Sequence, residues 1–278
     1  MYQRVFTYFR NFQRFQKAYF NSTTWYNFHK YKRLAFKLYK PPCILALTGF
    51  SMTDYGLSDD EIIKEAKISE NQDHSHRNGN GWEILVEEKE LRVYRRKLPG
   101  KSELYEYKCA GTYYDITPRN FVDAQLNIEY RREWDTNVLE LEILSDDPEN
   151  DIQVVRWVAK YPFPMNARMY IYVRKKIVDE NARKIIVSSH AVDEKLLPDK
   201  SKHVRVNNYR SSMVINAHKS FDDDGLDYVL TYHDDPQANI PNTAYNWIVN
   251  RGGPYFLKQV HIAAKKLEEA QEKRLLKN

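Results

Sequence analysis

The stretch VVRWVAKYPFPMNARMYIYVR, residues 154–174, decides the fold. It holds two segments rich in Val, Ile, Trp and Tyr, the types favoured in strands, joined by a turn with two prolines. In the first segment Trp157 alternates with Val155 and Ala159, so we expect these side chains to share an inward face. One face of the second segment suits either a partly polar cavity or solvent, because it carries Arg168, Tyr170, Tyr172 and Arg174.

Further segments of the same kind lie on both sides of this stretch. WEILVEE and LRVYRRKL, residues 82–88 and 91–98, flank a short turn and predict a hairpin. The other predicted strands are residues 103–114, 138–145, 151–161, 168–178, 184–192, 203–218 and 226–235. Together they predict a long antiparallel sheet.

Two helical segments interrupt and close this series of strands. Thr117 followed by Pro118 is an N-cap with proline at the first helical position, and it predicts a helix that runs through residues 121–134. Ile240-Pro241 opens another helical segment, which Gly252-Gly253 interrupts. It restarts at Pro254 with one apolar face made of Phe256, Leu257, Val260, Ala264 and Leu267. The predicted fold class is α+β, with a curved antiparallel sheet wrapped around a long C-terminal helix.

The charge of the chain is divided between two parts. Residues 1–53 contain nine Lys and Arg and no acidic residue, whereas the remainder has 34 Lys and Arg against 38 Asp and Glu. The overall excess of +5 therefore lies entirely in the N-terminal arm, and we expect no nucleic-acid binding by the folded part. No apolar run approaches the ~18–20 residues that span a bilayer as a helix.

The basic N-terminal arm, residues 1–53, is predicted to be a targeting or membrane-association segment. Arg10, Arg14 and Lys17 follow a helical spacing beside a face of aromatic residues, as in presequences and surface-bound amphipathic helices. A disordered basic tail and an aromatic-rich RNA-binding arm are the alternatives. The apolar stretch 43–52 near the end of this arm suits a processing site, a shallow anchor or core.

Residues 54–80 are predicted to form a short helix and a polar linker, ahead of a folded domain over 81–278. SDDE, Ser58–Glu61, is a capping box that opens a helix to about Ser69. His74 and His76 lie in the linker without a further ligand type nearby, which favours a solvated linker over a metal site.

Motifs for catalysis and metal binding are weak throughout the chain. In Ser188-Ser189-His190, neighbours on a strand point to opposite faces, so adjacency in the sequence argues against a hydrogen-bonded dyad. Asp222–Gly225 lacks the ligand spacing of a calcium loop, and Cys43 and Cys109 belong to no metal pattern. We therefore expect no enzyme, no metal and no cofactor.

Five motifs in order resemble the START (StAR-related lipid transfer) family across roughly residues 80–270. They are YRxxWD (130–135), the YPFP turn (161–164), VRVxxY (204–209), YHDDPQANIPN…NW (232–247) and GxPxFL (252–257). The chain is most similar to the phosphatidylcholine-transfer subgroup, and its basic arm resembles that of a mitochondrial member. The resemblance implies a helix-grip (START/Bet v 1-like) fold with a tunnel for one lipid under the C-terminal helix.

The resemblance also implies a lipid-binding site of five residues: Arg131, Asp135, Trp157, Tyr170 and Tyr209. In the subgroup, the Arg and Asp meet the phosphocholine group, and three aromatic residues surround its ammonium. Ser211 departs from the subgroup pattern, which has an amide-bearing Gln there. An Arg/Asp pair four residues apart is usually a surface pair worth ~0.3–0.5 kcal/mol, and core packing alone would also account for Trp157.

The chemistry of the proposed site suits a choline lipid. A quaternary ammonium cannot donate hydrogen bonds, so π faces hold it at ~0.5–2 kcal/mol each, while a guanidinium suits the phosphate. We therefore expect a monomeric, non-enzymatic carrier of phosphatidylcholine that contacts membranes transiently, at mitochondria and in the cytoplasm. The alternatives are a START-type carrier of sterol or ceramide, and a lipid-responsive adaptor.

Overall fold

The computed structural model describes residues 58–71, 81–100, 104–161, 163, 165–235 and 253–275. Three predictions lie outside these residues: the targeting segment 1–53, the linker residues 72–80 with His74 and His76, and the helical segment from Ile240 to Gly252.

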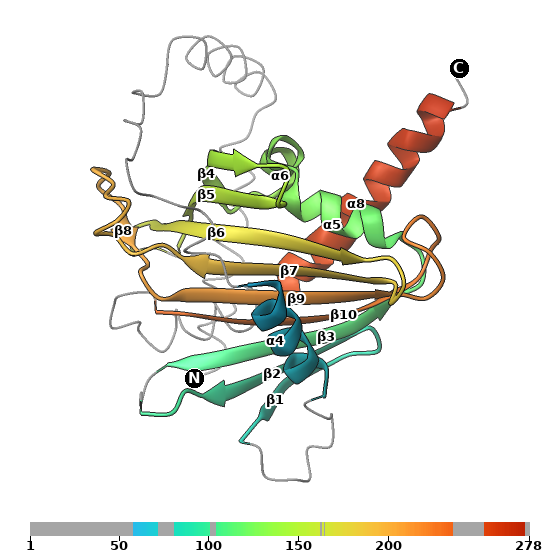
Figure 1. The fold of residues 1–278 in the computed structure, drawn as a ribbon, viewed down its shortest axis with the longest axis horizontal. Coiled ribbons are helices and arrows are strands. Elements are labelled where there is room, and N and C mark those ends of the chain that lie inside the picture. The colour runs from blue at the N-terminus through green and yellow to red at the C-terminus, as the bar shows by residue number, and fades with distance from the viewer. Residues whose placement is uncertain are drawn as a thin grey trace, which may run out of the picture. The chain divides into compact units, whose positions relative to one another are not determined.

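Strands form in every predicted region that the structure describes, and they join in one sheet that is antiparallel along the order β1-β2-β3-β10-β9-β7-β6-β5-β4 (Figure 1). Their bounds are β1 Glu83–Glu87, β2 Leu91–Lys97, β3 Tyr105–Tyr113, β4 Val138–Asp147, β5 Ile152–Ala159, β6 Arg168–Asp179, β7 Lys184–Ala191, β9 Tyr209–Ala217 and β10 Leu226–Asp234. The helices are α4 Asp59–Asn71, α5 Pro118–Leu126, α6 Ile128–Trp134 and α8 Gly253–Leu275. Sequence neighbours pair along most of the sheet, and β3 pairs with β10 to join the first hairpin to the rest.

The single helix predicted through residue 134 is wrong, because the chain breaks at Asn127 into α5 and α6. Asn127 still donates its N–H to the carbonyl oxygen of Asp123, but its backbone is extended, and this ends α5. Its side chain also caps α6 by accepting from the N–H of Tyr130 at 3.0 Å. An Asn side chain competes well with helical backbone bonds, which is why this residue can end one helix and start the next.

The predicted strand over residues 203–218 is also two elements. β8, Val204–Arg205, pairs with β6 in parallel, whereas β9 pairs antiparallel with β7 and β10. Between them the N–H of Val206 donates to the carbonyl oxygen of Met169, and Asn208 accepts from the N–H of Asp235. Within these few residues the chain therefore stops pairing with β6 and begins to pair with β10.

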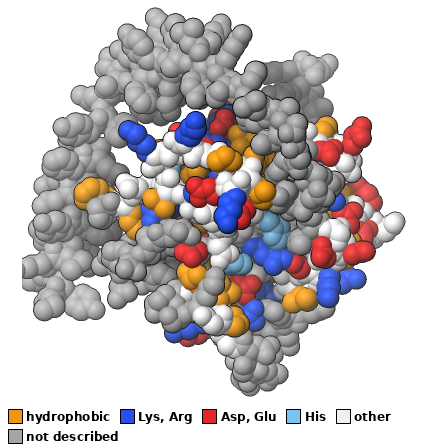
Figure 2. All heavy atoms as spheres, turned by 60° about the vertical axis from the view of Figure 1, so that its left-hand side comes forward, with side chains coloured by type: hydrophobic (Ala, Val, Ile, Leu, Met, Phe, Trp, Pro, Cys, Tyr) orange, Lys and Arg blue, Asp and Glu red, His pale blue; other side chains and the backbone are white. Residues whose placement is uncertain are grey.

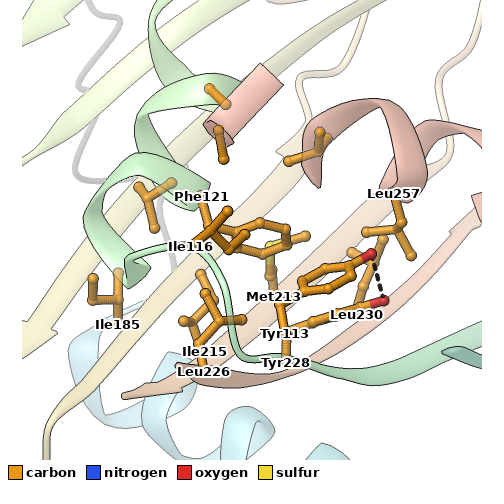
Figure 3. Close-up of a cluster of buried hydrophobic side chains, with 14 of the residues drawn as sticks. Tyr113, Ile116, Phe121, Ile185, Met213, Ile215, Leu226, Tyr228, Leu230 and Leu257 are labelled. Carbon is orange, nitrogen blue, oxygen red and sulfur yellow. Dashed lines mark hydrogen bonds between the residues drawn. The ribbon is translucent and has the colours of Figure 1, made fainter. Parts of the chain in front are cut away.

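The inner face of the sheet packs against α5 and α8 in the main hydrophobic core (Figures 1 and 3). The predicted apolar face of α8 is confirmed, since Leu257, Val260 and Ala264 are fully buried. Phe121 of α5 is fully buried and lies 5.3 Å from Tyr228, ring centre to ring centre. Every second side chain of the strands points to this face and forms the opposite wall of the core, because successive side chains of a strand point to opposite faces of the sheet.

The outer face of the sheet carries α4. Ile62 and Ala66 of this helix pack against Ile186 and Val214, which point away from the main core. The predicted capping box is confirmed: the N–H of Ser58 donates to the Glu61 carboxylate at 3.0 Å, and the N–H of Glu61 donates to Ser58 Oγ at 3.3 Å. Helices thus cover both faces of the sheet.

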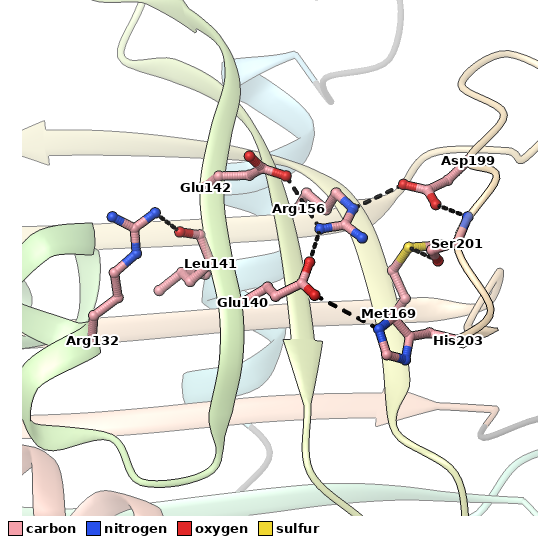
Figure 4. Close-up of polar contacts among 9 residues, drawn as sticks. All are labelled: Arg132, Glu140, Leu141, Glu142, Arg156, Met169, Asp199, Ser201 and His203. Carbon is pink, nitrogen blue, oxygen red and sulfur yellow. Dashed lines mark hydrogen bonds and ion pairs between the residues drawn. The ribbon is translucent and has the colours of Figure 1, made fainter. Parts of the chain in front are cut away.

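A cluster of charged side chains fastens the loop before β8 to the edge strand β4 (Figure 4). Arg156 projects from the outer face of β5 and donates to Asp199 at 2.8 Å, to Glu140 at 2.5 Å and to Glu142 at 3.2 Å.

Basic and acidic side chains lie interspersed on the surface seen in Figure 2. None of the helices in the described part of the chain is both long and apolar enough to cross a membrane.

Candidate functional site

Arg131 and Asp135 form a buried ion pair at the end of α6. Nε of Arg131 donates to Oδ2 of Asp135 at 3.2 Å, and the two side chains are only 10% and 4% exposed. Oδ1 of Asp135 accepts from the N–H of Asn137 at 3.1 Å, so both carboxylate oxygens have donors. The pair is therefore not the solvated surface pair that base rates suggest for this spacing.

The Arg131 guanidinium lies between the sheet and the C-terminal helix. Its central carbon is 5.0 Å from the ring centre of Trp157 on β5 and 5.3 Å from that of Phe256 on α8. These are cation–π distances, and they hold the planar group in a fixed orientation.

The three predicted aromatic residues lie beside this pair and contact one another. Trp157 and Tyr170 are cross-strand partners on β5 and β6, and their rings stack at 4.8 Å. Tyr209 of β9 meets Tyr170 edge-on at 5.4 Å. Buried Nε1 of Trp157 has no hydrogen-bond partner among the described residues. The three rings therefore line one end of the inner face with differently oriented π surfaces.

All five predicted residues line a single cavity between the sheet and the helices α5, α6 and α8. Its volume is about 250 Å³, counted as the space open to the centres of water molecules. A site for one water needs only about 10–15 Å³ on that measure, so the cavity is no packing defect. Apolar side chains make much of the wall, with Val122, Leu126, Val187, Met213, Ile215 and Leu230 among them.

Several residues that line the cavity were not among the five predicted lipid-binding residues. They are Tyr161, Tyr172, Arg174, Asp234 and Phe256, and of these Tyr172 and Arg174 were placed by alternation on a face suited to a cavity or to solvent. For Asp234 a signal existed, because Leu230, Tyr232 and Asp234 alternate along one strand and therefore share a face. Ser211, at the position of the subgroup's Gln, lines the cavity as well.

Asp234 is held by tyrosine hydroxyls. Tyr170 donates to its Oδ2 at 2.7 Å, and Tyr161 does so at 3.5 Å. The two hydroxyls are 3.1 Å apart. Burial raises the pKa of Asp234, and the hydrogen bond from Tyr170 opposes that rise only in part. Burial likewise raises the pKa of Tyr170 and Tyr209, so both phenols stay neutral.

Arg174 lies in the wall between this cavity and a second, more polar cavity, and it lines both of them. It donates to the carbonyl oxygen of Leu126 at 2.7 Å and to the side-chain oxygen of Gln153 at 2.6 Å. Burial lowers the pKa of Arg174. These bonds join the C-terminal end of α5 to β5.

The prediction that no serine–histidine pair forms around residue 188 is wrong in one respect. Ser188 Oγ lies 3.0 Å from Nε2 of His190, because residues two apart on a strand share a face. Ser188 is 2% exposed and is absent from the lining of the cavity, which includes its neighbour Ser189. The pair lies on the outer face of the sheet, where Ser188 is buried and His190 is half-buried. No group of three or more potential metal ligands is present in the described ranges.

Comparison with known families identifies the chain. The START domain family model matches residues 62–271, and the chain therefore belongs to that family. The helix-grip fold expected from the sequence motifs is the fold that the structure has.

Two groups of curated relatives are similar to the chain. It is 41% identical over 192 residues to human "StAR-related lipid transfer protein 7, mitochondrial", an alignment that covers 69% of this chain and 52% of the relative. It is 35% identical over 185 residues to mouse "Phosphatidylcholine transfer protein", covering 66% of this chain and 83% of the relative. The chain thus spans about half the length of the first of these relatives.

Solved structures show the same fold. The crystal structure of human STARD10 aligns with a TM-score of 0.64 and 20% identity, covering 80% of this chain and 86% of that one. Human StAR-related lipid transfer protein 5 aligns with a TM-score of 0.62 and 18% identity, covering 75% and 95%.

Proposed function

We propose that this protein is a non-enzymatic carrier that binds one phosphatidylcholine molecule in the cavity and moves it between membranes. The observation that carries the proposal is the buried Arg131–Asp135 pair beside the ring cluster of Trp157, Tyr170 and Tyr209. A guanidinium and several π faces at one end of an otherwise apolar cavity match a phosphate and an ammonium attached to acyl chains. The similarity to proteins named for phosphatidylcholine transfer supports the same cargo.

The energetics explain why a cavity serves this purpose. Each methylene group is worth ~0.8 kcal/mol on burial, so two long acyl chains cost more than ~20 kcal/mol to bring into water. A carrier lowers this barrier by keeping the chains dry, and no covalent bond changes. Because α8 closes one side of the cavity through Phe256, loading requires a movement of α8 or of nearby loops.

A transfer assay with the full chain tests this function. Donor vesicles contain labelled phosphatidylcholine and acceptor vesicles contain none, and the protein should raise the transfer rate in proportion to its concentration. Sterol and ceramide, the alternative cargoes, should move slowly in the same assay, because an uncharged hydroxyl head group leaves Arg131 and the rings without partners. Faster transfer of either alternative would contradict the cargo assignment.

We further propose that residues 1–53 direct the protein to mitochondria, with a second population in the cytoplasm. The acid-free composition of this arm supports the proposal, as does the name of the human relative that is 41% identical. A fusion of residues 1–53 to a fluorescent protein should colocalise with mitochondria. A diffuse signal would contradict it.

A further inference from the structure

The carboxylates of Asp135 and Asp234 line the cavity, and they differ in whether a positively charged side chain of the protein pairs with them. Asp135 faces a cation of the protein, since Arg131 donates to it at 3.2 Å. Asp234 accepts instead from the neutral hydroxyls of Tyr170 and Tyr161. Among the described Lys, Arg and His side chains, no ion pair with Asp234 is found; the charge of His233, its neighbour in sequence, lowers the pKa of Asp234 and so opposes part of the rise that burial causes. Asp234 is thus the cavity carboxylate without a protein counter-ion in the described region.

The position of Asp234 connects it to the aromatic cluster. Tyr170 stacks on Trp157, meets Tyr209 edge-on and donates its hydroxyl to Asp234 at 2.7 Å. The carboxylate therefore stands at the hydroxyl end of the central ring of the cluster, and it lines the cavity itself. A cation held by these ring faces would lie within the reach of its charge.

We propose that Asp234 is the counter-charge for the lipid's ammonium group, and that it selects head groups with a fixed positive charge. The inference rests on the proposed function, in which Arg131 receives the phosphate and the rings receive the ammonium. A half-buried carboxylate without a cation carries a desolvation cost, and a bound ammonium relieves that cost while the ring faces exclude water. The cavity would then hold a zwitterion by both of its charges, with Arg131 for one and Asp234 for the other.

The other charged and titratable groups near Asp234 leave this role open to it. Arg131 and Asp135 pair with each other at 3.2 Å, and buried Arg168 on β6 lies over the Tyr161 ring at 4.7 Å and donates to the carbonyl oxygen of Asn166 at 2.6 Å. Tyr161, Tyr170 on β6 and Tyr209 on β9 are neutral, because burial raises their pKa values. The sequence neighbours are His233 on β10, which hydrogen-bonds Asn208 at 3.3 Å, and Asp235 just after β10. His190 on β7 has a lowered pKa through burial.

The test compares two lipids that differ only in the charge of the head group. One is phosphatidylcholine; the other carries 3,3-dimethylbutanol in place of choline, which keeps the shape and the phosphate but has no positive charge. Transfer of each lipid between vesicles is measured with the full chain, with Asp234→Asn and with the control Asp235→Asn. Asparagine preserves the acceptor for Tyr170 and removes the charge.

Wild type and Asp235→Asn should prefer phosphatidylcholine to its uncharged isostere. Asp234→Asn should lower the rate for phosphatidylcholine about tenfold or more, the scale of a charge pair in a desolvated site, and leave the rate for the isostere unchanged. Equal losses for both lipids would show a structural role for Asp234 and overturn the proposal, as would a wild-type rate for phosphatidylcholine. Failure of the wild-type protein itself to carry phosphatidylcholine would instead refute the proposed function.

A second measurement serves if Asp234→Asn does not fold, which circular dichroism would reveal. The charge of a quaternary ammonium is independent of pH, so protons compete with phosphatidylcholine for Asp234 but not with the isostere. The preference of the wild-type protein for phosphatidylcholine should fall as the pH is lowered through the raised pKa of Asp234. A preference that stays constant down to the onset of acid unfolding would overturn the proposal.

Discussion

Two clusters of aromatic residues lie on the same face of the sheet and differ in what their polar atoms contact. In the main core, Tyr113 and Tyr228 stack at 5.3 Å, and their hydroxyls meet each other at 3.5 Å (Figure 3). In the cavity cluster, Trp157 lies against Arg131, and Tyr170 donates to Asp234. In the first cluster the two tyrosine hydroxyls contact each other. The second presents charges and π faces to an open space, and this difference is the basis of the proposed phosphatidylcholine site.

The largest expected effect separates the two clusters by stability. Phe121→Ala empties a fully buried position in the main core and should lower the free energy of unfolding by about 3–5 kcal/mol. Trp157→Ala borders an existing cavity and removes a buried N–H without a described partner, so it should cost less. Urea unfolding measures both. Equal losses would mean that the cavity cluster is ordinary core.

The next effect concerns lipid transfer, which should depend on the cavity cluster through Arg131. Arg131→Gln removes the guanidinium from the cavity and should lower phosphatidylcholine transfer about a hundredfold, the scale of a charged hydrogen-bonded partner lost from a buried site. Circular dichroism should show the fold retained. The control is Arg132→Gln on the same helix, whose guanidinium pairs with Glu129 at 2.8 Å outside the cavity. Transfer at the wild-type rate in Arg131→Gln would leave the ion pair without a role in binding.

A smaller effect concerns the charge of Asp234 in the lipid-free protein. Burial raises its pKa in the folded state above the value in the unfolded chain, so the folded protein binds more protons across that interval. The carboxylate therefore destabilises the fold at neutral pH, and this penalty disappears as the pH falls through the raised pKa. Lipid-free Asp234→Asn should be more stable than wild type at neutral pH, with a difference that shrinks on acidification. A constant difference would contradict the assignment of charge.

The smallest effect concerns the unpartnered indole N–H. Trp157→Phe keeps a π face and removes buried Nε1, so the free energy of unfolding should stay the same or rise by about 1 kcal/mol. Transfer should fall by only a few-fold, because Trp offers a better cation–π surface than Phe. A large loss of transfer would mean that the N–H itself contacts the lipid.

Much of the fold follows from local patterns in the sequence. The strands follow from alternation, and the capping box at Ser58 and the apolar face around Leu257 place two helices correctly. The break at Asn127 was not predicted, because an Asn in a helical segment ends the helix only when its side chain finds a backbone partner, here the N–H of Tyr130. The pairing of β8 with β6 depends likewise on contacts distant in sequence.

The site was accessible from the sequence only in part. Arg131 and Asp135 were expected to meet because four residues make one helical turn, but their burial depends on α8 and β5. Trp157, Tyr170 and Tyr209 come from three strands, and the family motifs rather than alternation singled them out. Asp234 remained unassigned, because its contact with Tyr170 joins strands that are not neighbours in the sheet.

Native mass spectrometry of the full chain after exposure to vesicles of mixed lipids tests the central proposal most directly. The vesicles should contain phosphatidylcholine, sterol and ceramide in equal amounts. We predict one bound lipid per chain, with the mass of phosphatidylcholine. Predominant sterol or ceramide, or a protein that leaves the vesicles without lipid, would contradict it.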